Sequence, residues 1–78
     1  MGISKLVSII KHSVIKLKVV PQENKYGFTL LRKGKEILIS APQYHSNTEA
    51  RKKGQEVISE IREGNFIDKG SYIPPEYL

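Results

Sequence analysis

The sequence predicts a small α+β fold, a three-stranded antiparallel β-meander with one α-helix packed on one face of the sheet. Two observations predict it. Runs in which apolar and polar residues alternate are separated by turn residues, and a helix-capping signal then precedes an apolar stripe of helical period. A length of 78 residues suits one domain. We expect residues 1–64 to form this single β-β-β-α domain and residues 65–78 to form an extended carboxyl-terminal arm.

The pairing of the second and third strands can be predicted from the parity of the apolar residues around Lys33-Gly34. Alternate side chains of a strand point to opposite faces, so the turn length decides which residues share a face. A two-residue turn at this point keeps the apolar residues of both strands together, whereas an odd-length turn separates them. The pairs predicted by the even turn are Leu30 with Ile37 and Phe28 with Ile39.

The first strand is predicted over residues 13–20, where Ile15, Leu17 and Val19 alternate with other side chains. Pro21 is expected to close it, because proline has no amide hydrogen to donate to a neighbouring strand. A four-residue turn at 22–25 keeps the apolar residues of this strand on the same side as those of the next. The predicted pairs are Val19 with Phe28 and Leu17 with Leu30.

The helix is predicted to begin at a capping box formed by Ser46 and Glu49, in which each side chain bonds to backbone near the other. Apolar and small residues follow at helical spacing, and these are Ala50, Gly54, Val57, Ile58 and Ile61. Gly64 is placed to end the helix. Glycine in a helix costs about 1 kcal/mol relative to alanine, so we expect Gly54 to permit close contact with the sheet.

The amino-terminal segment 1–12 fits either a helix or a further strand. Ile3, Leu6, Val7 and Ile10 lie at helical spacing, but the segment is rich in β-branched residues that also suit a sheet. Lysines interrupt every apolar run well short of the ~18 residues that a membrane span needs. No membrane span or signal peptide is therefore predicted.

Charge and cysteine content limit the possible partners. The chain has no cysteine, which excludes disulfide and thiolate metal sites and fits a reducing compartment, so we expect a cytoplasmic protein. The net charge is +5, and residues 1–53 carry eleven Lys and Arg against three acidic residues. A basic segment of this kind attracts phosphate groups or an acidic protein surface, including the acidic segment 54–78 of a second copy.

The sheet face opposite the helix is expected to carry more aliphatic side chains than a fully solvent-exposed face usually does. Its expected residues are Val14, Lys16, Lys18, Val20, Thr29, Leu31, Leu38 and Ser40. The amino-terminal segment, a second subunit or a ligand could cover it. The expected interface residues are Val14, Val20, Leu31 and Leu38.

A basic set of side chains on the first two strands and the second turn is the candidate nucleic-acid-binding surface. Its members are Lys16, Lys18, Arg32, Lys33 and Lys35. These cations could follow a phosphate backbone. The exposed mid-strand residues lack the Arg, Asn or Gln that read bases, so such binding would be only weakly sequence-specific.

No catalytic residue, metal site or cofactor is predicted. His12 and His45 have no carboxylate at ligand spacing, no serine has a nucleophile-elbow context, and the glycines do not form a phosphate loop. The segment Pro74-Pro75-Glu76-Tyr77 fits the Pro-Pro-x-Tyr pattern that WW domains bind, but a packed arm is the favoured interpretation.

The pattern Phe28-x-Leu30, Gly34, Ile37-x-x-Ser40, Tyr44-x-Ser46, Ala50, Val57 resembles the repeat of the YegP-like family of small bacterial proteins of unknown function. It covers residues 26–58. The family's helix glycine aligns with Lys53, whereas this chain has Gly54 one residue later. The resemblance implies three strands and a helix per repeat and two repeats packed together, so a chain with one repeat would pair with a second chain. It implies no catalytic residue.

These observations favour a non-enzymatic interaction module that acts as a homodimer through the outer sheet face. The alternative is a weakly sequence-specific DNA- or RNA-binding protein that uses its basic three-stranded sheet. An architectural likeness to the plant ethylene-response-factor domain and to the arm-binding domain of tyrosine recombinases supports this alternative. Those domains also set a three-stranded sheet on one helix, but this sequence lacks their Arg and Trp pattern.

Overall fold

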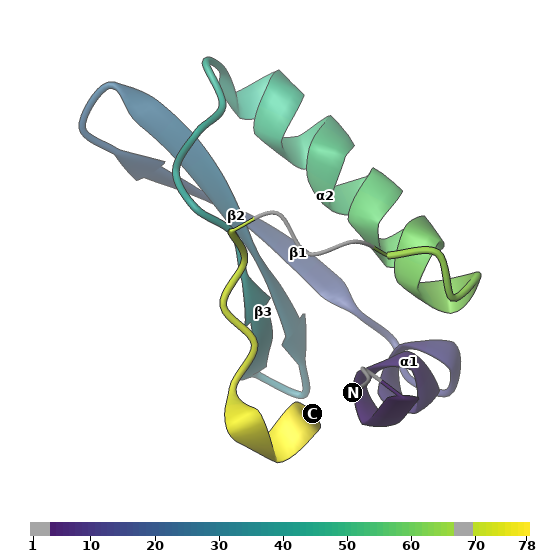
Figure 1. Ribbon diagram of the computed structural model, residues 1–78. Helices are drawn as coiled ribbons and strands as arrows, with labels where there is room; N and C mark the ends of the chain where they lie inside the picture. The colour runs from purple at the N-terminus through teal and green to yellow at the C-terminus, as the bar shows by residue number, and fades with distance from the viewer. Residues whose placement is uncertain (1–3, 67–69) are drawn as a thin grey trace.

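The computed structural model describes residues 4–66 and 70–78, and it confirms the α+β fold with a three-stranded antiparallel sheet. Figure 1 shows helix α2 lying across the sheet, with α1 beyond its carboxyl end. The sheet order is β1-β2-β3. The elements are α1 (Ser4–Lys11), β1 (Lys16–Gln22), β2 (Lys25–Arg32), β3 (Lys35–Ile39), α2 (Asn47–Arg62) and the 3-10 helix η1 (Pro75–Tyr77).

The first hairpin has the predicted register. Val19 pairs with Phe28 and Leu17 with Leu30, and the pairing continues to Gln22 and Lys25, so the turn has two residues and not the predicted four. The strand begins at Lys16 and not at the predicted residue 13. The prediction that Pro21 closes the strand is wrong, because β1 runs on to Gln22. Since β1 lies at the edge of the sheet, it can accommodate a residue that lacks an amide hydrogen.

The second hairpin has the predicted even turn but a different register beyond it. Lys33 and Gly34 both have positive φ, 53° and 80°, as a type I′ turn requires. The ladder then shifts between Leu30 and Leu31, and Leu38 rather than Ile37 pairs with Leu30. The predicted pairs of Leu30 with Ile37 and Phe28 with Ile39 are therefore wrong, because one strand of the ladder holds an extra residue.

This β-bulge turns two consecutive residues of β3 into the core. Ile37 and Leu38 are both fully buried, although strict alternation would place them on opposite faces. The shift also means that the residues of β3 after it point to the opposite face from the one predicted. Ser40 is buried, and its Oγ accepts a hydrogen bond of 2.8 Å from the amide of Phe28. The predictions that Leu38 and Ser40 lie on the outer face are wrong for this reason.

Helix α2 is capped at both ends by residues that the sequence identified. The Ser46 Oγ accepts from the amide of Glu49 at 3.0 Å, whereas the Glu49 carboxylate accepts from the amide of His45. At the other end, Gly64 has a φ of 77° and its amide donates to the carbonyl of Ile61. A further bond from Asn65 to Glu60 completes a Schellman motif.

Gly54 brings α2 close to the sheet, as predicted. A Cβ atom at this position would overlap the side chain of Leu17 and would lie 3.2 Å from Cδ1 of Phe28. The glycine is buried together with Ala50, Val57 and Ile61 of the predicted stripe, whereas Ile58 is half-buried. Close approach therefore explains a helix-weakening residue in the middle of α2.

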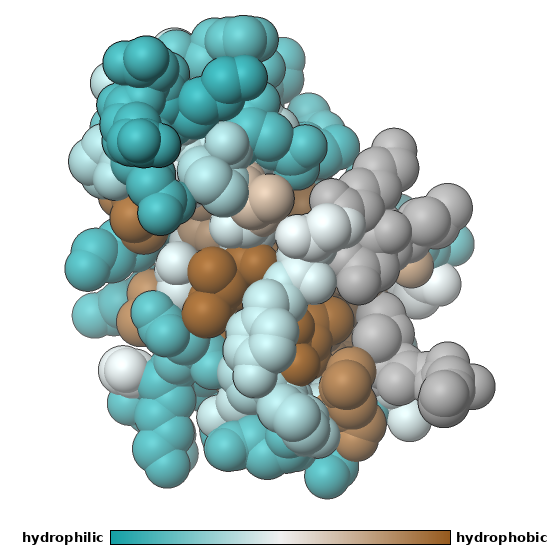
Figure 2. Space-filling model, turned by 60° about the vertical axis from the view of Figure 1, so that its left-hand side comes forward, coloured by the Kyte–Doolittle hydropathy of each residue, from teal (hydrophilic) through white to brown (hydrophobic). Residues whose placement is uncertain are grey.

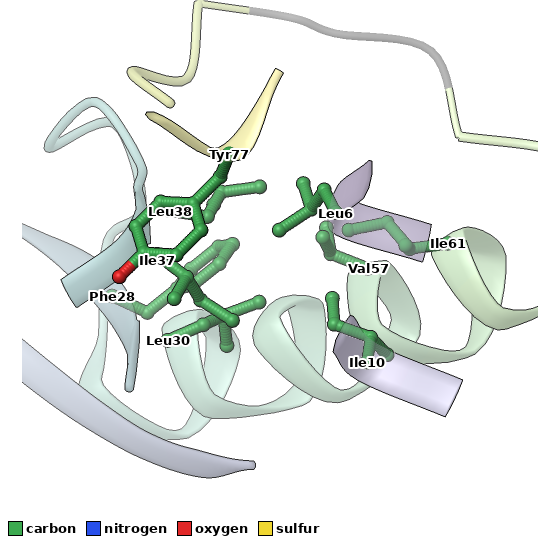
Figure 3. Close-up of a cluster of buried hydrophobic side chains, with 9 residues drawn as sticks. All are labelled: Leu6, Ile10, Phe28, Leu30, Ile37, Leu38, Val57, Ile61 and Tyr77. Atoms are coloured by element: carbon green, nitrogen blue, oxygen red, sulfur yellow. The ribbon is translucent and has the colours of Figure 1, made fainter. Parts of the chain in front are cut away.

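The core lies between the sheet and the two helices, and it also draws in the carboxyl terminus. Figure 3 shows Leu6 and Ile10 of α1 pointing toward Val57 and Ile61 of α2. The open choice for the amino-terminal segment is thus resolved in favour of a helix over 4–11. Residues 1–3, which include Ile3 of the predicted stripe, lie outside the described residues.

The carboxyl-terminal segment packs on its own domain. Tyr72 and Ile39 exchange two backbone hydrogen bonds of 2.7 and 2.8 Å, which extends the sheet beyond β3. The segment then forms η1, and Tyr77 enters the core beside Leu38 (Figure 3). A tyrosine only 9% exposed is not presented to a WW domain.

On the face drawn in Figure 2, hydrophobic patches appear between hydrophilic side chains rather than as one continuous area.

Candidate functional site

The outer face of the sheet is the side turned away from α2. Leu17 and Phe28 face α2 at Gly54, so the residues that alternate with them in the ladder point the other way. The pairing extends this face across β3 to the carboxyl-terminal segment. Its members are Lys16, Lys18, Val20, Thr29, Leu31, Glu36, Ile39 and Tyr72.

Apolar side chains on the outer face remain accessible. Tyr72 is 57% exposed and Val20 is 37% exposed, while Leu31 and Ile39 are half-buried. Thr29 in the central strand is only 3% exposed. Both helices contribute to the core on the opposite side. The exposed apolar side chains of the outer face, Val20 and Tyr72, thus lie toward its two sides, while Thr29 at its centre is buried. Its charged residues lie on β1 and β3.

Three outer-face residues were missed in the sequence: Glu36, Ile39 and Tyr72. Ile39 was assigned to the core by strict alternation, and the bulge reverses that assignment. Tyr72 joins the face only because its segment pairs with β3, a contact between residues 33 positions apart in the chain. No local pattern predicts either event. Glu36 could have been found from the sequence, because the predicted two-residue turn pairs it with the outer-face residue Leu31, as the structure shows.

A groove of about 610 Å³ lies where β1 begins and the second hairpin turns. It contains three of the predicted basic residues and two of the predicted interface residues. The lining consists of His12, Ser13, Val14, Lys16, Leu31, Arg32, Lys33 and Gly34. None of these described lining residues is acidic. We call this site the basic groove.

Arg32 is held in place within the basic groove. Its Nε donates a hydrogen bond of 2.9 Å to Oγ of Ser13, which lies in the loop between α1 and β1. Both residues are partly buried. Val14, next to the serine, is 81% exposed. The groove therefore presents an oriented guanidinium beside an accessible apolar side chain.

The five predicted basic residues do not form one continuous track. Lys16, Arg32 and Lys33 line the basic groove, whereas Lys18 and Lys35 do not. Lys18 lies on the outer face two residues beyond Lys16. Lys35 closes the second hairpin opposite Arg32. The interface set is divided as well, because Val14 and Leu31 line the groove, Val20 lies further along the face and Leu38 is in the core.

A second cavity and a possible metal site are less well supported as functional sites. A cavity of about 280 Å³ lies beside Phe28, Tyr44 and Val57, but its wall ends at Phe66 and Ser71, next to residues outside the described ranges. Within residues 4–66 and 70–78, no three His, Cys, Asp or Glu side chains come together as metal ligands would. In the same ranges, no helix has the length and apolar character to cross a membrane.

Comparisons of this chain with protein-family models, with curated proteins and with solved structures found no match. The resemblance to the YegP-like family stays a prediction.

Proposed function

We propose that this protein is a non-enzymatic interaction module that associates with a second copy of itself through the outer face of its sheet. The observation that supports this most directly is the accessible apolar surface formed by Val20, Leu31, Ile39 and Tyr72. A domain of 78 residues has a small core, and dimerisation is a common way to bury more apolar area.

The charges of the outer face complement those of a second copy. Lys16, Leu31 and Glu36 form one row across the three strands, with the apolar residue in the centre. A two-fold axis parallel to β2 stacks two outer faces so that β1 of one copy lies opposite β3 of the other. The lysine then faces the glutamate of the second copy, and the two leucines meet. Such an interface is isologous and closes after two copies.

The resemblance of residues 26–58 to a family whose repeats pack in pairs points in the same direction. Under this proposal, each chain supplies one repeat of the pair. The absence of cysteine fits a cytoplasmic location for the dimer.

Sedimentation velocity over micromolar concentrations tests the proposal. We expect the wild-type chain to sediment as a dimer and Leu31→Glu to sediment as a monomer, because a carboxylate would be buried at the centre of the interface. Leu78→Glu is the matched control, since Leu78 is 53% exposed and does not belong to the outer face. It should leave the dimer unchanged.

A charge exchange tests the geometry of the interface separately. Lys16→Glu and Glu36→Lys should each weaken the dimer, because like charges would meet, and the double variant should restore it. A wild-type chain that remains monomeric at high micromolar concentration would refute self-association. If the double variant dimerises as weakly as the single variants, the two-fold arrangement is refuted.

A further inference from the structure

We infer that the basic groove binds a phosphate monoester attached to an apolar or planar organic group, such as the 5′-phosphate of a nucleotide. This inference goes beyond self-association, because it assigns a ligand class to a groove that overlaps the outer face only in part. Lys16 and Leu31 belong to both surfaces, whereas the other lining residues do not belong to the outer face. The inference rests on the juxtaposition of Lys16, Arg32 and Lys33 with the apolar side chains of Val14 and Leu31 in one groove.

The first argument is the orientation of Arg32. Its Nε bond to Ser13 holds the guanidinium plane, and the two terminal nitrogens are left to donate to a ligand. A planar fork of this kind matches the oxygens of a phosphate group with two parallel hydrogen bonds. Because the side chain is already held, less conformational entropy is lost on binding. Ser13 is thus a positioning residue for the arginine.

The second argument is the charge of the lining. Three side chains of the groove are cationic, and no described lining residue is acidic. A phosphate monoester carries about −1.5 to −2 charges at neutral pH, whereas a carboxylate carries only one. The divalent anion balances the three cations better.

The size and apolar part of the groove argue for an organic ligand rather than a free ion. The groove is open to solvent, and its volume of about 610 Å³ leaves room for an organic group beside the phosphate. Val14 and Leu31 offer apolar contact, and the imidazole of His12 offers a planar surface for stacking. Inorganic phosphate would leave these side chains without contacts.

Nuclear magnetic resonance titration of the ¹⁵N-labelled 78-residue chain tests the inference. The probes are adenosine 5′-monophosphate, adenosine and inorganic phosphate. We expect saturable shift changes for the amides of residues 12–16 and 31–34 with the nucleotide, and weaker binding of the other two probes. Equal affinity for adenosine, or no change in these amides at millimolar nucleotide, would overturn the assignment.

Two matched pairs of variants separate a groove from a general basic surface. Lys16→Gln and Lys33→Gln should each weaken nucleotide binding by about tenfold, the loss expected for a hydrogen bond between charged groups. Lys18→Gln and Lys35→Gln remove the same charge from neighbouring positions outside the groove and should have little effect. Equal weakening within a pair would show that only the net charge matters.

A third comparison tests the positioning role of Ser13. Ser13→Ala should weaken binding without changing the net charge, and Ser13→Thr should restore it because the hydroxyl returns. Equal binding by the alanine and threonine variants would remove this role.

A final comparison identifies the source of the phosphate monoester. A short oligothymidylate is tested with and without a 5′-phosphate. Binding of the phosphorylated strand assigns the monoester to a nucleic-acid end, and binding of the free nucleotide alone assigns it to a small molecule. Equal binding of the unphosphorylated strand would overturn the preference for a monoester. Sedimentation of the same samples measures self-association separately. Because Lys16 and Leu31 belong to both surfaces, ligand and second copy compete for them, and nucleotide should shift a dimer toward the monomer. A monomeric chain that binds nucleotide refutes self-association alone, and a dimer that does not bind it refutes the ligand assignment alone.

Discussion

Gly54 illustrates how a single residue sets the distance between two layers. Its lack of a side chain lets α2 approach Leu17 and Phe28, at a cost in helix propensity of about 1 kcal/mol. The sequence indicated this role from the position of the glycine in the apolar stripe. It could not identify Leu17 as the residue in contact, because that depends on where the helix crosses the sheet.

A double-mutant cycle measures this contact. Gly54→Ala should gain little or no stability in the wild-type chain, because the added Cβ displaces the Leu17 side chain. In the Leu17→Ala background the same change should stabilise by about 1 kcal/mol, the difference in helix propensity. Urea unfolding of the four chains gives the coupling energy. The interpretation fails if Gly54→Ala has the same effect in both backgrounds.

The β-bulge is the element-scale feature that separates the observed sheet from the sheet predicted by alternation. The turn chemistry at Lys33-Gly34 correctly specified the pairs nearest the turn. Beyond Leu31, alternation alone does not reveal a bulge, because 37–39 is a continuous apolar run that reads equally well in either register. Leu38 was therefore assigned to the surface and Ile39 to the core.

Comparison of two leucine truncations tests the bulge in solution. Leu38→Ala should destabilise the fold by about 2–5 kcal/mol, because a fully buried side chain leaves a cavity. Leu31→Ala at a half-buried position should cost about 1 kcal/mol or less in the monomer. The measurement is the unfolding free energy in urea at a concentration below self-association. Similar losses for both variants would contradict the shifted register between β2 and β3.

At the scale of the whole molecule, the core is completed by residues from both ends of the chain. Leu6 and Ile10 enter it from α1, and Tyr77 enters it from η1 (Figure 3). The central hairpins and α2 were predictable because turn and cap residues mark them locally. A packed carboxyl-terminal arm was predicted, but the places where the two ends pack were not, because they depend on contacts between residues far apart in the sequence. The basic groove shares this origin, since Ser13 and Arg32 meet only in the folded chain.

Truncation of Tyr77 tests whether the carboxyl-terminal segment belongs to the cooperative fold. Tyr77→Ala should lower the unfolding free energy by about 3–5 kcal/mol, as for other buried aromatic residues. Leu78→Ala, at the adjacent exposed position, should change it by about 0.5 kcal/mol at most. Thermal and urea denaturation both report the difference. An unchanged midpoint for Tyr77→Ala would mean that the segment is dispensable for stability.

The two edges of the sheet have a consequence for how copies of this protein meet. Pro21 and two lysines occupy the β1 edge, and the pairing of Tyr72 with Ile39 occupies part of the β3 edge. Unpaired edges are the usual starting points for continuous growth into fibrils, and proline, lysine and a covering segment are the devices that prevent it. A chain protected in this way should resist amyloid formation at high concentration.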